Sequence, residues 1–305
     1  MDNREQRFLA LHPRYWPSWF GVGLLRLLAF LPLPLLALLG NGIGLLLYAL
    51  HAPRRRVAYL NLARCFPNLS PRQVRQLVRR HFRAFGQTLL DVAIAWWAGR
   101  RRVSRLVRFR DRHYYEEARL SGRNVILFAP HFLGLEMGGV RLSLDGPLVS
   151  VFRHPDNELV RRLMLRARLR FGARLIEHNQ PFTSLVRAVK AGTPLYYLPD
   201  QDAGRRHSVF APFFGIPAAT FTALARLARM TGAVVIPCIT YQRSWGRGYE
   251  IVFRPPLAGF PSGDDAADAT RMNHEIEQAV LEHREQYFWL HKRFKTRPVG
   301  EPKFY

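Results

Sequence analysis

Cysteine is scarce in this 305-residue chain, and several common catalytic motifs are missing. Two cysteines, Cys65 and Cys238, are too few for a small secreted fold built on several disulfides. No cysteine–histidine cluster has zinc-finger spacing, and no H-E-x-x-H signature occurs. The chain also lacks a Walker A loop, a G-x-G-x-x-G turn after a predicted strand, and the G-x-S-x-G motif. These absences argue against metal, nucleotide and serine-hydrolase chemistry.

Negative charge and lysine are also under-represented. The chain has 46 basic residues against 22 acidic ones, a net charge of +24, and only four of the basic residues are lysine. Arginine binds phosphate and carboxylate groups through two parallel hydrogen bonds. Nucleic acid, anionic lipid headgroups and an acidic carrier protein all fit this charge. A GC-rich genome would explain the arginine-to-lysine ratio, but not the net charge.

One long apolar segment lies near the N-terminus. Phe20–Leu50 contains a single charged residue, Arg26. About 20 apolar residues cross a bilayer, so we predict one membrane span within Pro17–Leu39. Two alternatives stay open: Pro32 and Pro34 break the segment into two interfacial helices, or the segment is a buried core helix.

Arginines flank this segment on both sides and suit anionic headgroups, but they do not fix its orientation. They are Arg4, Arg7, Arg14, Arg54, Arg55 and Arg56.

The rest of the chain predicts an α/β fold with a mixed central sheet flanked by helices. Residues 57–121 have helical spacing of apolar residues, with Ser70 as a helix cap. From residue 122 onward short apolar strands alternate with amphipathic helices, which is typical of α/β proteins. The predicted strands are Val125–Pro130, Pro147–Phe152, Pro194–Asp200, Ala233–Tyr241 and Tyr249–Phe253. The predicted helices are Glu158–Phe171, Phe182–Ala191, Ala218–Thr231 and Asp264–Gln286.

We therefore divide the chain into three segments. Residues 1–56 form a predicted N-terminal membrane anchor, residues 57–121 a helical segment, and residues 122–305 an α/β domain. We expect residues 57–305 to form one catalytic unit.

Polar or ionisable residues stand at the ends of the first three predicted strands. His131 follows the first strand, Arg153 and Asn157 follow the second, and Asp200 is the last residue of the third. Ligands of α/β sheets bind beyond the carboxyl ends of the strands, so we expect these side chains to share one crevice. Arg153, Asn157 and Asp200 are candidate substrate-binding residues.

The motif HFLGLE places His131 and Glu136 five residues apart. A carboxylate can hold one imidazole nitrogen while the other takes a proton from a hydroxyl group. On an ideal helix five residues leave about 140° between the side chains, so this pair requires His131 to precede the helix. The alternative is a structural histidine without a catalytic role.

Two further groups of residues suit an anionic, apolar substrate. Arg168 and Arg170, near the end of a predicted helix, are candidates for binding phosphate or stabilising developing negative charge. The alternative is a solvated basic face. Phe213 and Phe214 are candidates for an acyl channel, although core packing is the commoner use of such residues.

These motifs resemble the late acyltransferases of lipid A biosynthesis, which act on Kdo-lipid IV-A. The resemblance covers nearly the whole chain, and the opening and closing blocks are most similar to the lauroyl-transferring members. Palmitoleoyl- and myristoyl-transferring relatives share most of the core. The matching blocks are LHPRYW, NLARCFPNLS, HFLGLE, FRHPDN, RLR, PDQD, VFAPFFG and WLHKRFKTRP.

The resemblance implies a glycerolipid-acyltransferase-like fold and a reaction. In this reaction an acyl chain passes from acyl carrier protein to a hydroxyl on an acyl chain of the lipid A precursor. The similarity to the lauroyl-transferring members implies that the transferred chain is lauroyl. His131 would be the general base and Glu136 its orienting partner, while Arg168 and Arg170 would bind phosphate or stabilise the thioester oxyanion. Asp200 would position a sugar or an arginine.

The implied partners are acyl carrier protein, the lipid A precursor and inner-membrane lipid, without nucleic acid, metal or cofactor. The implied location is the bacterial inner membrane, with a single N-terminal span or interfacial anchor and the catalytic domain at the cytoplasmic face. Three other functions stay open: palmitoleoyl or myristoyl transfer in the same pathway, acylation of glycerolipids or lysophospholipids, and a non-enzymatic, membrane-bound polyanion-binding protein.

Overall fold

A computed structural model of the chain describes residues 12–153, 155–206 and 208–305. The flanking arginines Arg4 and Arg7, the first residue of LHPRYW (Leu11) and the start of the predicted anchor lie outside the described residues.

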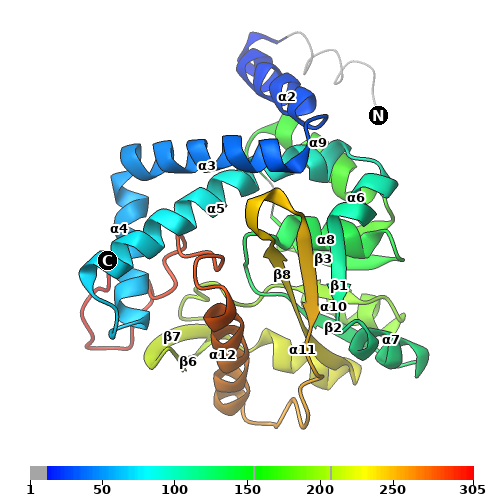
Figure 1. The fold of residues 1–305 in the computed structure, drawn as a ribbon. Coiled ribbons are helices and arrows are strands. Elements are labelled where there is room, and N and C mark those ends of the chain that lie inside the picture. The colour runs from blue at the N-terminus through cyan, green and yellow to red at the C-terminus, as the bar shows by residue number, and fades with distance from the viewer. Residues whose placement is uncertain (1–11, 154, 207) are drawn as a thin grey trace.

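A seven-stranded mixed sheet forms the centre of the fold (Figure 1). Its strand order is β1-β9-β8-β2-β5-β3-β4, and all neighbouring strands are parallel except β8 and β9. The carboxyl ends of β2, β5 and β3 therefore meet at one edge of the sheet. The strands are β1 (Val107–Arg110), β2 (Val125–Phe128), β3 (Leu148–Phe152), β4 (Ala173–Glu177), β5 (Leu195–Tyr197), β8 (Val234–Gln242) and β9 (Tyr249–Phe253).

Helices cover both faces of the sheet, and β2 shows how its residues divide between them. Val125 and Leu127 belong to one hydrophobic cluster, while Ile126 and Phe128 belong to the other. All four are buried, as expected for a central parallel strand. The covering helices are α4 (Ala52–Cys65), α5 (Pro71–Trp97), α6 (Arg100–Leu106), α7 (His113–Leu120), α8 (Leu135–Ser143), α9 (Glu158–Leu169), α10 (Phe182–Lys190), α11 (Ala223–Thr231) and α12 (Asp265–Glu282).

The predicted α/β class and mixed sheet are confirmed, and so is the cap of the long helix. Ser70 accepts a hydrogen bond from the backbone N–H of Gln73, and the Gln73 side chain accepts one from the backbone N–H of Ser70. This capping box, with Pro71 at the first helical position, fixes where α5 begins.

Three of the secondary-structure predictions are wrong. The segment 57–121 is not purely helical, because β1 joins the sheet as an edge strand beside β9. β4 was absent from the predicted strands. The helix predicted at Ala218–Thr231 begins only at Ala223. Its first predicted residues belong instead to β7 (Ile216–Phe221), which forms a hairpin with β6 (Ser208–Phe213).

The hairpin turn consists of Phe214 and Gly215, both with positive φ (49° and 74°). Two-residue hairpin loops favour this conformation because it matches the twist of the strands. The hairpin buries Ala211, Phe213, Ala218, Ala219 and Thr220, and its alanines are more typical of a helix than of a strand.

The N-terminal apolar segment forms two helices rather than one span over Pro17–Leu39. α2 (Trp16–Leu28) projects from the body, and α3 (Leu33–Leu50) lies along it (Figure 1). Pro32 precedes α3 and Pro34 stands in its first turn, where the missing N–H costs least. By length and composition, α3 is the one described helix long and apolar enough to cross a membrane.

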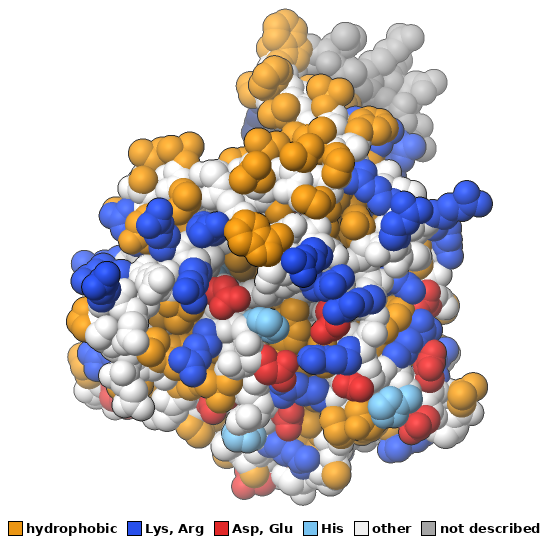
Figure 2. Space-filling view, in the orientation of Figure 1, with side chains coloured by type: hydrophobic (Ala, Val, Ile, Leu, Met, Phe, Trp, Pro, Cys, Tyr) orange, Lys and Arg blue, Asp and Glu red, His pale blue; other side chains and the backbone are white. Residues whose placement is uncertain are grey.

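α3 packs along α5 through three glycines. A Cβ added to Gly44 would lie 2.1 Å from the carbonyl oxygen of Phe82, and one added to Gly86 would lie 2.1 Å from that of Gly40. The two backbones therefore touch directly. The opposite face of α3 and much of α2 are apolar and exposed (Figure 2).

This close approach makes a specific prediction. Replacing Gly44 by alanine should lower the free energy of unfolding by about 1–3 kcal/mol, since the methyl group meets backbone rather than a movable side chain. Gly42→Ala on the same helix is the matched control, because nothing lies within 4 Å of its added Cβ. Denaturant unfolding of the detergent-solubilised protein measures both. Equal stability of the two variants would contradict the direct helix contact.

Candidate active site

His131 lies in the loop between β2 and α8, at the carboxyl edge of the sheet. The C-terminal segment fixes this loop from the other side. The backbone N–H of Phe288 donates to the carbonyl of His131 (2.9 Å), and that of Leu133 donates to the carbonyl of Gln286 (2.9 Å). The main chain of the histidine is therefore held by residues more than 150 positions away.

Asp200, which follows β5, is the carboxylate that contacts His131. Its Oδ1 lies 2.6 Å from the ring Nδ1, and its Oδ2 accepts a hydrogen bond from the backbone N–H of His131 (2.8 Å). An ionised carboxylate only accepts hydrogen bonds, so Nδ1 carries a proton, and in the neutral ring Nε2 keeps its lone pair. The pair thus has the arrangement of a general base and its orienting acid.

Electrostatics keep this carboxylate ionised. Asp200 is 1% exposed, and burial alone raises its pKa. The charge of His131 and the two hydrogen bonds from that residue outweigh burial, so the pKa of Asp200 lies below its ordinary value. His131 itself stays partly exposed, with 24% of its side chain accessible.

Glu136 does not pair with His131, contrary to the sequence prediction. It lies in the first turn of α8, and both of its oxygens accept hydrogen bonds from Arg168 on α9, at 2.9 and 2.6 Å. Such two-point pairing is the strongest hydrogen bonding an arginine makes with a carboxylate. Asp200 occupies the position at Nδ1 because β2 and β5 are neighbours in the sheet.

The Glu136–Arg168 pair keeps the guanidinium charged. Burial lowers the pKa of Arg168, but the charge of Glu136 and its hydrogen bonds raise it overall. A fixed positive charge therefore stands beside the histidine.

His131 and the Glu136–Arg168 pair line one cavity of about 360 Å³, and Asp200 is buried behind the histidine. His131, Glu136, Arg168 and Arg153 lie on its wall. A volume of about 300–1,000 Å³ with apolar walls and a few polar groups is typical of ligand sites. The rest of the lining is largely apolar and includes Leu135, Val140, Leu148, Val151, Phe152, Met164, Leu175 and Leu198.

Other predicted site residues lie elsewhere. Asn157 caps α9, accepting from the N–H of Val160 (3.1 Å), and donates to Ser18 of α2 (2.9 Å). Arg170 donates to the carbonyl of Ala95 at the end of α5, away from Glu136.

The predicted acyl channel does not include the two phenylalanines. Phe213 is fully buried among Phe214, Tyr287 and Phe294, and Phe214 forms the hairpin turn. Within the described residues, neither lines the cavity beside His131. Core packing explains these residues, because an aromatic cluster closes the end of the hairpin.

Sequence reasoning missed two supports of the site. Tyr196 lines the cavity, and its hydroxyl donates to the carbonyl of Leu135 (3.3 Å). The C-terminal block also serves the site rather than a ligand: Arg293 is buried and bonds to Ala219, Thr220 and Asn273. The aromatic residues of that block were the available signal, since such residues are often buried.

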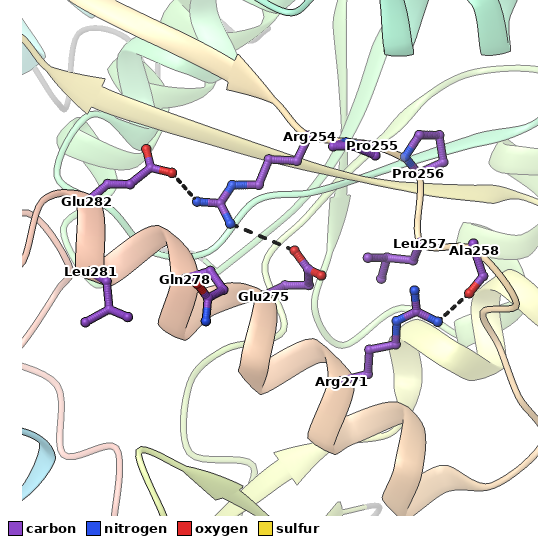
Figure 3. A pocket seen from close by; sticks show the side chains of 10 residues that line it. All are labelled: Arg254, Pro255, Pro256, Leu257, Ala258, Arg271, Glu275, Gln278, Leu281 and Glu282. Atoms are coloured by element: carbon purple, nitrogen blue, oxygen red, sulfur yellow. Dashed lines mark hydrogen bonds and ion pairs between the residues drawn. The ribbon is translucent and has the colours of Figure 1, made fainter.

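A larger groove of about 620 Å³ lies between the end of β9 and α12 (Figure 3). Arg254 there is paired with Glu282 (2.5 Å) and Glu275 (3.9 Å), and Arg271 donates to the carbonyl of Ala258. Its charges are thus internally neutralised, and neither His131 nor Asp200 lines it. No three metal-ligating side chains cluster in the part of the chain that the structure describes.

Comparison with known proteins gives the context for this site. Residues 4–296 match the family model of bacterial lipid A biosynthesis acyltransferases. The chain is 36% identical to the lipid A biosynthesis lauroyltransferase of Escherichia coli (strain K12), over 97% of this chain and 96% of that protein. It is 35% identical to the palmitoleoyltransferase of that strain over the same shares. It is 32% identical to the myristoyltransferase, over 95% of this chain and 90% of that protein.

The matches extend over nearly the whole chain and include the site residues described above. They decide against a non-enzymatic polyanion-binding protein, and also against a glycerolipid or lysophospholipid acyltransferase. The chain belongs to the bacterial lipid A biosynthesis acyltransferase family, and it is an acyltransferase of that pathway.

Proposed function

We propose that this protein transfers a lauroyl chain from acyl carrier protein to a hydroxyacyl hydroxyl of Kdo-lipid IV-A. The observation that supports this most directly is the His131–Asp200 pair at the wall of an apolar cavity. Acyl transfer between a thioester and a hydroxyl needs a base, an apolar space for the chain and a positive charge near the carbonyl. This one cavity offers all three.

In the proposed mechanism His131 Nε2 removes the proton from the acceptor hydroxyl. The hydroxyl oxygen attacks the thioester carbonyl, the carbon–sulfur bond breaks, and the proton passes from the imidazolium to the departing thiolate. Asp200 holds the ring in the tautomer that this step requires and stabilises its charged form. The reaction balances without any further reactant.

Arg168 is proposed to stabilise the negative charge that develops on the carbonyl oxygen. Glu136 fixes the guanidinium through two hydrogen bonds, so it need not reorganise during the reaction. Glu136 would therefore act through Arg168 rather than through His131.

We further propose an inner-membrane location, with the catalytic unit at the cytoplasmic face. Large apolar residues on α2 and α3 are exposed, among them Trp16, Phe20, Leu27, Leu38 and Leu46. Figure 2 shows hydrophobic side chains gathered over the surface of α2 and α3. Because one face of α3 is fastened to α5, an interfacial position of α3 accounts for its packing better than an isolated span.

The acyl chain can be tested directly. Purified protein is given the lipid A precursor and acyl carrier protein loaded with lauroyl, myristoyl or palmitoleoyl chains. We expect the highest kcat/KM for lauroyl, by about tenfold or more, because each methylene in an apolar pocket contributes about 1–3 kcal/mol of discrimination. A higher kcat/KM for either longer chain would refute the lauroyl assignment.

Asp200→Asn should lower kcat by about 10³–10⁴-fold with little change in KM, because the amide can present its N–H to the ring and favour the wrong tautomer. Asp145→Asn is the control. That carboxylate is ion-paired with Arg112 and Arg141 and does not line the cavity. Near-normal kcat in a folded Asp200→Asn variant, verified by its melting temperature, would remove Asp200 from the mechanism.

Glu136→Gln and Arg168→Lys should each lower kcat by about 10–1,000-fold, since each breaks the two-point pair beside the carbonyl. The double variant should lose far less than the product of the two effects, because the residues act as one unit. Steady-state kinetics of the four proteins gives this cycle. Independent, multiplicative effects would mean that Glu136 acts elsewhere.

A further inference from the structure

A second cavity, of about 450 Å³, lies between α2, the end of α5 and α9. It is separate from the catalytic cavity, and the two share none of their lining residues. Its lining consists of Arg26, Trp96, Trp97, Leu163, Arg166, Ala167 and Arg170.

Every polar side-chain group in this lining is a hydrogen-bond donor. Guanidinium groups and indole N–H groups donate and cannot accept. Among the described residues, no acidic side chain is paired with Arg26, Arg166 or Arg170. A ligand for this cavity must therefore bring acceptors and negative charge.

Arg170 shows most clearly that this cavity has more hydrogen-bond donors than acceptors. Its Nη2 donates to the carbonyl of Ala95 (2.7 Å), but its Nε is buried without a partner in the described structure. Burial lowers the pKa of this arginine to about 10. A buried donor without an acceptor is costly, and an anion in the cavity would relieve that cost.

Two arginines at the start of α9 are paired with a carboxylate. Arg161 and Arg162, at its start, are both ion-paired with Glu158 (2.5 and 2.6 Å). In the β9–α12 groove Arg254 is also ion-paired, with Glu282 and Glu275 (Figure 3). Arg166 and Arg170, by contrast, have no carboxylate partner among the described residues.

α9 joins this cavity to the active site. Met164 and Arg168, four residues apart, face the catalytic cavity, while Arg166 and Arg170, also four apart, face the second one. Residues spaced by four lie on one face of a helix. A lipid that reaches both cavities would straddle a single rigid helix.

Exposed apolar residues surround the cavity. α2, which carries Arg26, exposes Trp19, Phe20, Leu24, Leu27 and Phe30. Arg26 itself lies over the rings of Phe30 and Trp97, at 5.5 and 5.8 Å. Tryptophan and arginine beside exposed apolar residues are typical of the headgroup level of a bilayer.

We propose that this cavity, defined by Arg26, Arg166 and Arg170 with Trp96 and Trp97, binds a phosphate group of the lipid acceptor. The site holds the acceptor by its phosphate on one side of α9, while the hydroxyl to be acylated lies on the other side near His131. The inference rests on the proposed function for the identity of the acceptor. The anion-binding chemistry of the cavity does not depend on it.

The test uses Arg26→Gln, Arg166→Gln and the double variant, with the phosphorylated precursor and its enzymatically dephosphorylated form as acceptors. For the phosphorylated acceptor we expect KM to rise about tenfold or more for each arginine removed, with kcat little changed, because charge-assisted hydrogen bonds are lost. For the dephosphorylated acceptor the variants should match the unaltered protein. Arg166→Lys should restore part of the lost affinity.

Arg187→Gln on α10 is the matched control, because it removes one exposed arginine far from α2 (Figure 1). This control should leave both KM values unchanged. If the double variant keeps the full preference for the phosphorylated acceptor, the proposal is wrong.

Flotation with phosphatidylcholine vesicles separates the sources of phosphate and needs no turnover. Vesicles carrying the phosphorylated precursor should bind the double variant more weakly than the unaltered protein, and those carrying the dephosphorylated form should not. An equal loss with vesicles containing phosphatidylglycerol would show a general anionic-lipid site and overturn the proposal. Absence of acyl transfer by the unaltered protein would refute the proposed function, while flotation would still test the cavity.

Discussion

The hydrogen bond between His131 and Asp200 is the constraint on which the site depends. It joins the ends of two neighbouring parallel strands, β2 and β5, so the register of the sheet determines the distance between base and acid. The backbone hydrogen bond from His131 to the second carboxylate oxygen prevents Asp200 from turning away. Without this contact the imidazole would have no fixed tautomer, and the apolar cavity beside it would lack an oriented base.

The C-terminal segment completes this constraint from outside the sheet. The Tyr287 hydroxyl donates to the carbonyl of Asp200, and Thr296 donates twice to the side chain of Asp202. The segment thus contacts both loops that carry the pair. Tyr287 and Thr296 therefore help to hold the two loops at their relative positions.

The sequence predicted the sheet and the position of His131 because buried strands are continuous apolar runs and ligands collect at their carboxyl ends. It also predicted that His131 and Asp200 would face one crevice. It could not show that β2 lies directly beside β5, and strand order is what assigns Asp200 rather than Glu136 to the ring nitrogen. Local sequence also could not show the role of Phe213 or the presence of β4. The apolar character of Phe213 fits a channel or a core equally well, and β4 (Ala173–Glu177) carries too many polar residues to stand out as a strand.

The contact of α3 with α5 at Gly40, Gly44 and Gly86 has a mechanical consequence. Because backbone rests on backbone, α3 has no flexible tether to the catalytic unit. In the proposed interfacial position of α3, the mouth of the cavity beside His131 would be held at a constant height relative to the bilayer. The reactive hydroxyl of an acceptor would then have to lie at the depth that this helix pair sets.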